Sequence, residues 1–208
     1  MQRALTSTEN FGSELEQTSL DSGRVFPSDN WLALQLEEVS KIIQLDTGTF
    51  GTERAAFFTE IGGFDTHGTV NIASRMREID NALAAFSAEL KDQGVWDGVT
   101  VIVASEFGRT LDTNGQGTDH GWGGNYFVVG GGVKGAQMLG QYPNRLIEFE
   151  SDTNLGRGRM LPTTPWEAVW NAVSEWWDIG PADRDEILPN KANFGADAIL
   201  TRAQLFDN

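Results

Sequence analysis

The sequence contains no cysteine and only two histidines, His67 and His120, in 208 residues. The lack of cysteine excludes a disulfide framework, a thiolate nucleophile and a zinc–thiolate site. No apolar run approaches the roughly 20 residues that a membrane-spanning helix needs, so we expect no transmembrane segment. Residues 1–29 lack the basic and then apolar layout of a signal peptide, so we expect no signal peptide in this chain.

Basic residues are also scarce. The 15 lysines and arginines stand against 30 aspartates and glutamates, which gives a net charge of −15. Because nucleic acids and anionic membrane surfaces are bound through basic faces, the composition predicts no nucleic-acid partner. It favours cations or cationic partners, and it is typical of a protein kept soluble in salty or extracellular water.

The spacing of apolar residues differs between residues 1–27 and the rest of the chain. Residues 1–27 show no sustained period and are predicted to form an irregular N-terminal arm. Residues 28–208 are predicted to form a single domain, since a chain of this length can bury one sizeable core.

Three segments have the spacing of amphipathic helices. Residues 30–45 form the first, which Ser28 or Asp29 can cap. A second begins at residue 72, where apolar residues recur at steps of four and three: Ile72, Met76, Ile79, Leu83, Phe86 and Leu90. A third follows Thr164, which is expected to act as the first residue of a capping box.

Strands are expected around the second helix. Residues 54–60 resemble a short buried strand, and residues 99–104 form a continuous apolar, β-branched run of the kind found in central parallel strands. The order strand, helix, strand predicts a right-handed βαβ unit, and hence an α/β fold with a parallel sheet covered by helices. A further strand is expected over residues 126–129.

Carboxylates and imidazoles gather in glycine-rich turns near the expected strand ends. Asp65 and His67 follow the first strand, Glu106 follows the second, and Asp119 and His120 lie in a further turn. Because carboxylate and neutral imidazole bind divalent cations when no thiolate is present, these five residues are candidate ligands for one or two metal ions. Alternatively, the aspartates form turns by bonding the backbone, and the histidines only stack nearby.

Arg109 is the candidate substrate-binding residue. Its planar guanidinium can bind a phosphate, sulfate or carboxylate group. The alternative is an ion pair with Glu106 or Asp112. The ligand types do not determine whether the metal is zinc, calcium, magnesium or manganese.

These motifs, taken together, resemble a known family. The matching pieces are Gly-Gly-Phe-Asp-Thr-His at 62–67, Glu-Phe-Gly-Arg-Thr at 106–110, Asp-His-Gly-Trp-Gly at 119–123 and Gly-Gly-Gly-Val-Lys-Gly at 130–135. They stand in the order found in domain-of-unknown-function family 1501, whose members are exported, sulfatase-like proteins of the alkaline phosphatase superfamily. The chain resembles the C-terminal part of such a protein.

The resemblance implies an alkaline-phosphatase-like three-layer sandwich, with a largely parallel sheet and helices on both faces, of which this chain holds the C-terminal portion. It also implies a location outside the cytoplasm, periplasmic or secreted. In the metal crevice of the superfamily, Asp65 and His67 match the first ligand group, and His120 matches the last. Where a second metal would have an imidazole, this chain has Phe107.

Two classes of function follow, and they leave open whether the chain is an enzyme. The nucleophile of the superfamily comes from an N-terminal segment that residues 1–50 do not resemble. The favoured class is therefore a catalytically degenerate domain with a binding or structural role, holding one divalent cation. The alternative is a metal-dependent hydrolase of phosphate or sulfate esters whose nucleophile comes from another segment or chain. An incomplete sheet would also favour self-association or a partner chain.

Overall fold

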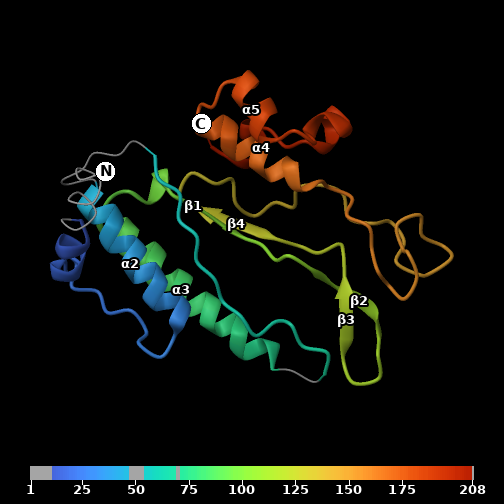
Figure 1. Cartoon of the computed structure of the whole chain (residues 1–208), viewed down its shortest axis with the longest axis horizontal. Coiled ribbons are helices and arrows are strands. Elements are labelled where there is room, and N and C mark those ends of the chain that lie inside the picture. The colour runs from blue at the N-terminus through green and yellow to red at the C-terminus, as the bar shows by residue number, and fades with distance from the viewer. Residues whose placement is uncertain (1–10, 47–53, 69–70, 208) are drawn as a thin grey trace, which may run out of the picture. The chain divides into compact units, whose positions relative to one another are not determined.

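The computed structural model describes residues 11–46, 54–68 and 71–207 (Figure 1). Contacts divide the chain into two compact units. One comprises Met1–Asp65 and Asn71–Trp96, and the other comprises Thr66–Val70 and Asp97–Asn208. The predicted arm over 1–27 and single domain over 28–208 stay predictions, because a compact unit need not coincide with a domain that folds alone.

A helical hairpin forms the centre of the first unit. Helices α2 (Trp31–Leu45) and α3 (Ile72–Asp92) lie side by side, as Figure 1 shows, so the helices predicted over 30–45 and from residue 72 are confirmed. Ala33 of α2 and Ala82 of α3 are both fully buried. The remaining buried apolar residues of the pair are Leu32, Leu36, Val39, Ile79, Phe86 and Leu90.

The cap of α2 differs from the prediction. Asn30 is the N-cap, and its side-chain oxygen accepts a hydrogen bond from the Ala33 amide at 3.2 Å. Its Nδ2 donates to the Glu78 carbonyl of α3 at 2.6 Å. Ser28 and Asp29 were therefore the wrong choice, because Asn30 uses its acceptor for its own helix and its donor for the neighbouring one.

The N-terminal residues of the first unit are anchored on this hairpin. Residues 11–17 are helical, and Leu20 and Phe26 are buried. The side chain of Glu89 in α3 is completely buried; it accepts a hydrogen bond from the Ser22 hydroxyl and lies 3.5 Å from Arg24 Nε. Pairing of this kind offsets the cost of burying a carboxylate.

The second unit contains two small antiparallel sheets. Strand β1 (Thr100–Val103) pairs with β4 (Phe127–Gly130), with Thr100 opposite Gly130. Strand β2 (Gly108–Thr113) pairs with β3 (Thr118–Gly121), with Arg109 opposite His120. Within the described residues, each sheet consists of these two strands.

The predicted parallel sheet, and with it the alkaline-phosphatase-like sandwich, is wrong. Residues 54–60 form no strand, and Phe58 is 88% exposed, so the βαβ unit lacks its first strand. The strand predicted over 99–104 exists, but it is half-buried and its partner is antiparallel. An apolar, β-branched run indicates a strand, whereas the direction of its partner depends on the segments between them.

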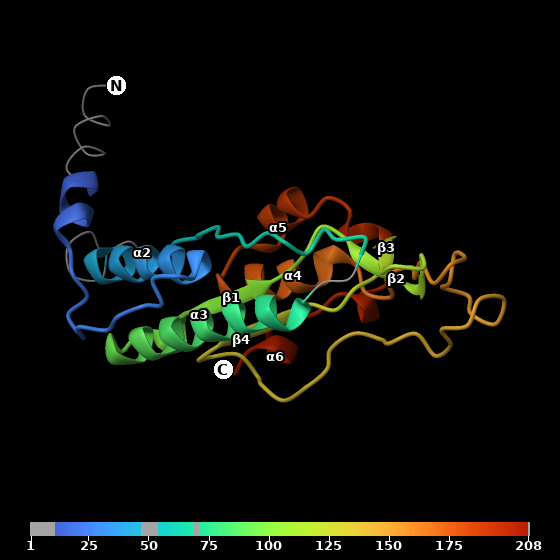
Figure 2. The same ribbon diagram turned by 90° about the horizontal axis from the view of Figure 1, so that it is seen from below.

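The C-terminal part of the second unit is helical. It contains α4 (Trp166–Trp176), α5 (Pro181–Ile187), α6 (Arg202–Leu205) and two short 3₁₀ helices, η3 (Lys191–Asn193) and η4 (Ala196–Ala198). Helices α4 and α6 are close together (Figure 2), and their shared core comprises Ala168, Ala172, Leu200, Leu205 and Phe206. Pro165 is the N-cap of α4 and no side chain caps it, so the capping box predicted at Thr164 is wrong.

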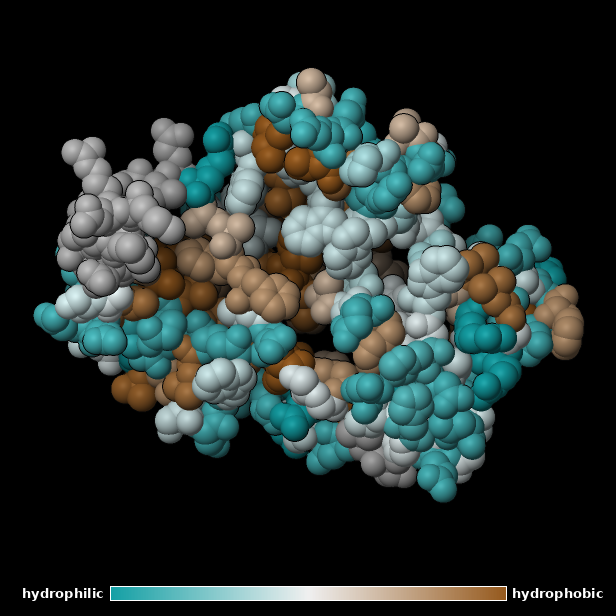
Figure 3. All heavy atoms as spheres, viewed as in Figure 1, coloured by the Kyte–Doolittle hydropathy of each residue, from teal (hydrophilic) through white to brown (hydrophobic). Residues whose placement is uncertain are grey.

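Apolar side chains are common on the surface. Figure 3 shows brown, apolar residues at several places on one face among teal, polar ones. Phe149 is 97% exposed and Met138 is 84% exposed. Such residues are the kind that a partner chain or self-association would cover, which stays a prediction. Within the described residues, no helix has both the length and the apolar character needed to cross a membrane.

Replacing Asn30 by alanine tests the cap. Asn30→Ala removes both of its hydrogen bonds, so we expect it to lower the free energy of unfolding by about 2 kcal/mol, the upper end for an N-cap. Asp29→Ala is the matched control, since Asp29 is exposed and does not cap α2. Urea unfolding followed by circular dichroism measures both. Equal losses in the two variants would contradict the assignment.

Candidate metal centre

His67 lies 52 residues before Asp119, the residue next to His120, yet the two histidine rings are in contact. His120 lies on β3, and the rings of His67 and His120 stack with their centroids 5.0 Å apart. The turn after β2 holds the His67 segment, because Asn114 Nδ2 donates to the His67 carbonyl at 3.0 Å. Gly117 permits this approach, since a Cβ there would lie 2.8 Å from the Gly68 carbonyl oxygen. His67, Asn114, Gly115 and Gln116 line a shallow depression.

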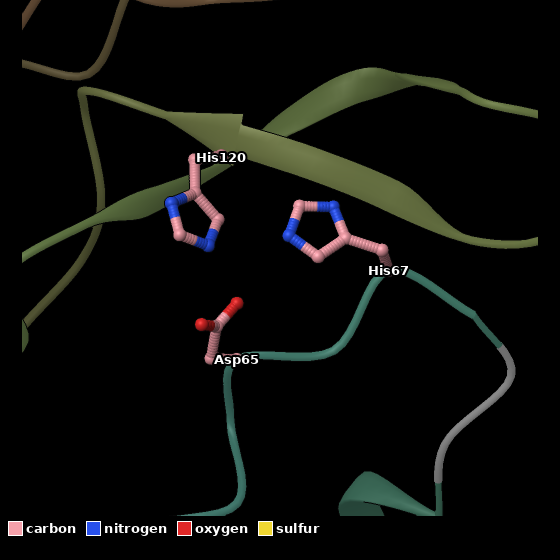
Figure 4. Close-up of side chains that lie close together, drawn as sticks. All are labelled: Asp65, His67 and His120. Atoms are coloured by element: carbon pink, nitrogen blue, oxygen red, sulfur yellow. The ribbon is translucent and has the colours of Figure 1, made fainter.

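Asp65 precedes His67 by two residues and completes a cluster. Asp65, His67 and His120 each offer one ligand atom, and these atoms all lie within 4.8 Å of one another. Figure 4 shows the carboxylate and the two imidazole rings facing one another. A tetrahedral ion with bonds of about 2.0–2.1 Å needs ligand atoms about 3.4 Å apart, so small side-chain movements suffice to bind one. All three residues are exposed, and an ion can reach them from solvent.

Asp119 contacts the His67 ring but is not part of this cluster. Its Oδ1 is 3.2 Å from His67 Nδ1 and accepts a hydrogen bond from Asn114 Nδ2 at 2.9 Å. Its Oδ2 accepts from Arg157 Nη2 at 2.6 Å. A carboxylate that accepts a proton from one ring nitrogen leaves the lone pair on the other, which is how ligand histidines are oriented in metal sites. Asp119 therefore has the position of an orienting residue.

The same contacts keep Asp119 ionised. The hydrogen bond from Asn114, followed by those from His67 and Arg157, holds the pKa of the Asp119 carboxyl well below its usual range. The Asp119 amide donates to the hydroxyl of the buried Thr110 at 3.1 Å, which fixes the backbone. A stable negative charge beside His67 favours the Nδ1-protonated tautomer that ligation through Nε2 requires.

His120 is held by stacking. The Phe107 ring lies almost parallel to the His120 ring, at 11° and with 4.0 Å between centroids. The Arg109 guanidinium carbon lies 5.0 Å from the centre of the Phe107 ring, and Arg109 Nη1 donates to the Thr118 carbonyl at 2.9 Å. Arg109 thus braces the β2–β3 pair beside the histidine, and its predicted role in anion binding stays a prediction.

Glu106 lies apart from the cluster. It is exposed, and its Oε2 accepts a hydrogen bond from the Ser105 hydroxyl at 3.4 Å. Desolvation, together with the charge of Glu106, raises the pKa of Tyr126. Of the five candidate ligands, the structure brings together Asp65, His67 and His120. Asp119 contacts His67 but is not in this group, and Glu106 lies outside it. Sequence reasoning missed Arg157, for which the glycines on both sides were the available signal.

The fold and this cluster define a protein of helices and short β-ribbons with a candidate metal centre. A family model described as "Protein of unknown function (DUF1501)" matches residues 33–152, which is more than half of the chain, so the chain belongs to that family. The match includes all six predicted site residues and confirms the resemblance to the family, while the relation to sulfatases stays a prediction. No curated protein and no solved structure matches the chain.

The lowered pKa of Asp119 predicts how stability depends on pH. A carboxyl whose pKa is lower in the folded state adds stability above its unfolded value, about 3.9, and loses it as pH falls toward the folded value. Asp119→Asn should therefore be less stable than wild type at pH 7, and the difference should shrink below about pH 4. Urea midpoints from pH 7 to pH 2.5, with chelator present, measure it.

Asp112→Asn serves as the control, because Asp112 is an exposed carboxylate on the same ribbon. It should unfold at the wild-type midpoint at neutral pH. A stability difference between wild type and Asp119→Asn that stays constant down to pH 2.5 would show that the carboxylate charge is not what the neighbouring groups stabilise.

Proposed function

We propose that this chain binds one divalent cation through Asp65, His67 and His120, and that it has a binding or structural role without ester hydrolysis. The observation that carries the proposal is the convergence of the three ligand atoms within 4.8 Å. It is supported by the hydrogen bond of Asp119 to His67 and by the stacking of Phe107 on His120, which orient one ring each.

The ligand types favour zinc among the four ions considered. Two imidazole nitrogens and one carboxylate oxygen suit zinc, whereas calcium and magnesium prefer sites made of oxygen. Three protein ligands leave a fourth tetrahedral position for water or for a group from a partner. The net charge of −15 also raises the local concentration of cations around the protein.

The absence of catalysis is supported by the surroundings of His120. Where the family resemblance would place the imidazole of a second metal, the Phe107 ring packs on His120 at 4.0 Å and offers no ligand atom. Glu106 lies outside the cluster, and its carboxylate is the one ligand of the expected pair that a second ion would still have. The described residues do not form the sandwich fold, so only Phe107 and Glu106 support the absence of catalysis. The location outside the cytoplasm implied by the resemblance stays a prediction.

Binding is tested with zinc added to protein that has been stripped by a chelator. A ligand that binds only the folded state stabilises it by about 2.7 kcal/mol at 100 times its Kd, so we expect saturating zinc to raise the Tm. Calorimetric titration should give one ion per chain. His67→Ala and His120→Ala should each abolish the rise in Tm, and acidification should weaken binding because protons compete for imidazole.

Glu106→Gln is the matched control and should respond to zinc as wild type does. Its loss of the response, or two ions per chain, would contradict a single site at the three residues. Zinc-loaded wild type should also fail to hydrolyse aryl phosphates and aryl sulfates. Turnover that His67→Ala abolishes would instead support the metal-dependent hydrolase.

A further inference from the structure

A turn far along the chain reaches the candidate metal centre. Gly156, Arg157 and Gly158 have φ values of +94°, +57° and +69°, so three successive residues are in the left-handed region. That conformation favours glycine, and a non-glycine residue there needs support from its surroundings. The Arg157 amide donates to the Glu148 carboxylate at 3.0 Å, and the Gly158 carbonyl accepts from the Leu111 amide at 3.1 Å.

The turn is packed directly on the ribbon that carries Asp119. A Cβ at Gly158 would lie 2.5 Å from the Leu111 nitrogen, so only glycine fits between the turn and β2. Two residues later, the Met160 carbonyl accepts a hydrogen bond from the Gly123 amide at 2.7 Å, just beyond the end of β3. Residues 158–160 are thus hydrogen-bonded to β2 and to the residues that follow β3.

The Arg157 side chain uses this position to hold Asp119. Its Nη2 lies 2.6 Å from Asp119 Oδ2, while Oδ1 is engaged by Asn114 and His67. Both carboxylate oxygens therefore have partners from the protein. A charged hydrogen bond from a guanidinium is among the stronger ones, and it competes with any cation for that oxygen.

We propose that Arg157 determines the metal selectivity of the centre. By holding Asp119 as the hydrogen-bond acceptor of His67, it keeps a second carboxylate out of the coordination sphere. This inference rests on the proposed cation site. The ligand set then stays at two nitrogens and one oxygen, which favours zinc, whereas adding Asp119 would make the set richer in oxygen and more suitable for manganese. Arg157 lies outside the matched residues 33–152, so the family match gives it no role.

The test compares zinc and manganese affinities in wild type, Arg157→Gly and Arg157→Lys. Glycine suits the φ of +57° and removes the guanidinium without straining the turn. Loss of an outer-shell partner costs about 10- to 100-fold in metal affinity, so Arg157→Gly should bind zinc at least about tenfold more weakly. Its manganese affinity should hold or rise. Arg157→Lys keeps the charge and should recover part of the preference.

Arg145→Ala is the matched control, because Arg145 lies in the same loop and pairs only loosely with Glu150, at 4.0 Å. It should keep both wild-type affinities. A second readout needs no metal: ¹⁵N shifts of the His67 ring should show the Nδ1-protonated tautomer in wild type and less of it in Arg157→Gly.

The outcomes separate the two proposals. If wild type binds neither ion, the proposed cation site fails, and the selectivity inference fails with it. If wild type binds zinc but Arg157→Gly has an unchanged ratio of zinc to manganese affinity, only the inference fails. An equal loss of both affinities also overturns it, because that pattern indicates a purely structural role.

Discussion

The hydrogen bonds of the Asp119 carboxylate are the interactions on which the candidate centre depends. The two oxygens of this carboxylate bring together His67, Asn114 and Arg157, which come from three separate turns of the chain. In the part of the chain that the structure describes, the ribbon that carries Asp119 consists of β2 and β3, and an isolated pair of strands is marginally stable in water. The charged contacts around Asp119 therefore do more than orient a histidine. They connect the ribbon to two loops that have little buried apolar surface of their own.

The residues of the candidate centre have different roles. Asp65, His67 and His120 present ligand atoms, and a different contact restrains each ring, a carboxylate for His67 and an aromatic face for His120. Preorganisation of this kind lowers the entropy that ion binding would otherwise cost. The centre is nevertheless exposed, which suits exchange with solvent ions or contact with a partner group. The match over residues 33–152 shows that the chain belongs to the family described as DUF1501. The proposed cation site is a hypothesis for the chemistry of this member.

Sequence reasoning succeeded where the signal is local and failed where it is not. The periodicity of α2 and α3 gave both helices, because a 3.6-residue pattern reports one buried face regardless of fold. The run 99–104 was correctly predicted as a strand, but its direction relative to its partner is not encoded in its own residues. The expected partner over 54–60 is exposed and irregular. In the site, both histidines were predicted as ligands because the sequence has only two of them. Glu106 was predicted as a ligand because a parallel sheet was assumed. The role of Asp119 depends on contact with Arg157, 38 residues away, which no spacing rule predicts.

Zinc K-edge X-ray absorption on the zinc-loaded wild-type protein tests the central claim most directly. The account predicts nitrogen and oxygen ligands at about 2.0–2.1 Å, with the outer-shell scattering of two imidazole rings. In His120→Ala, the signal of one ring should disappear. A spectrum of oxygen ligands without imidazole scattering would contradict a centre formed by Asp65, His67 and His120.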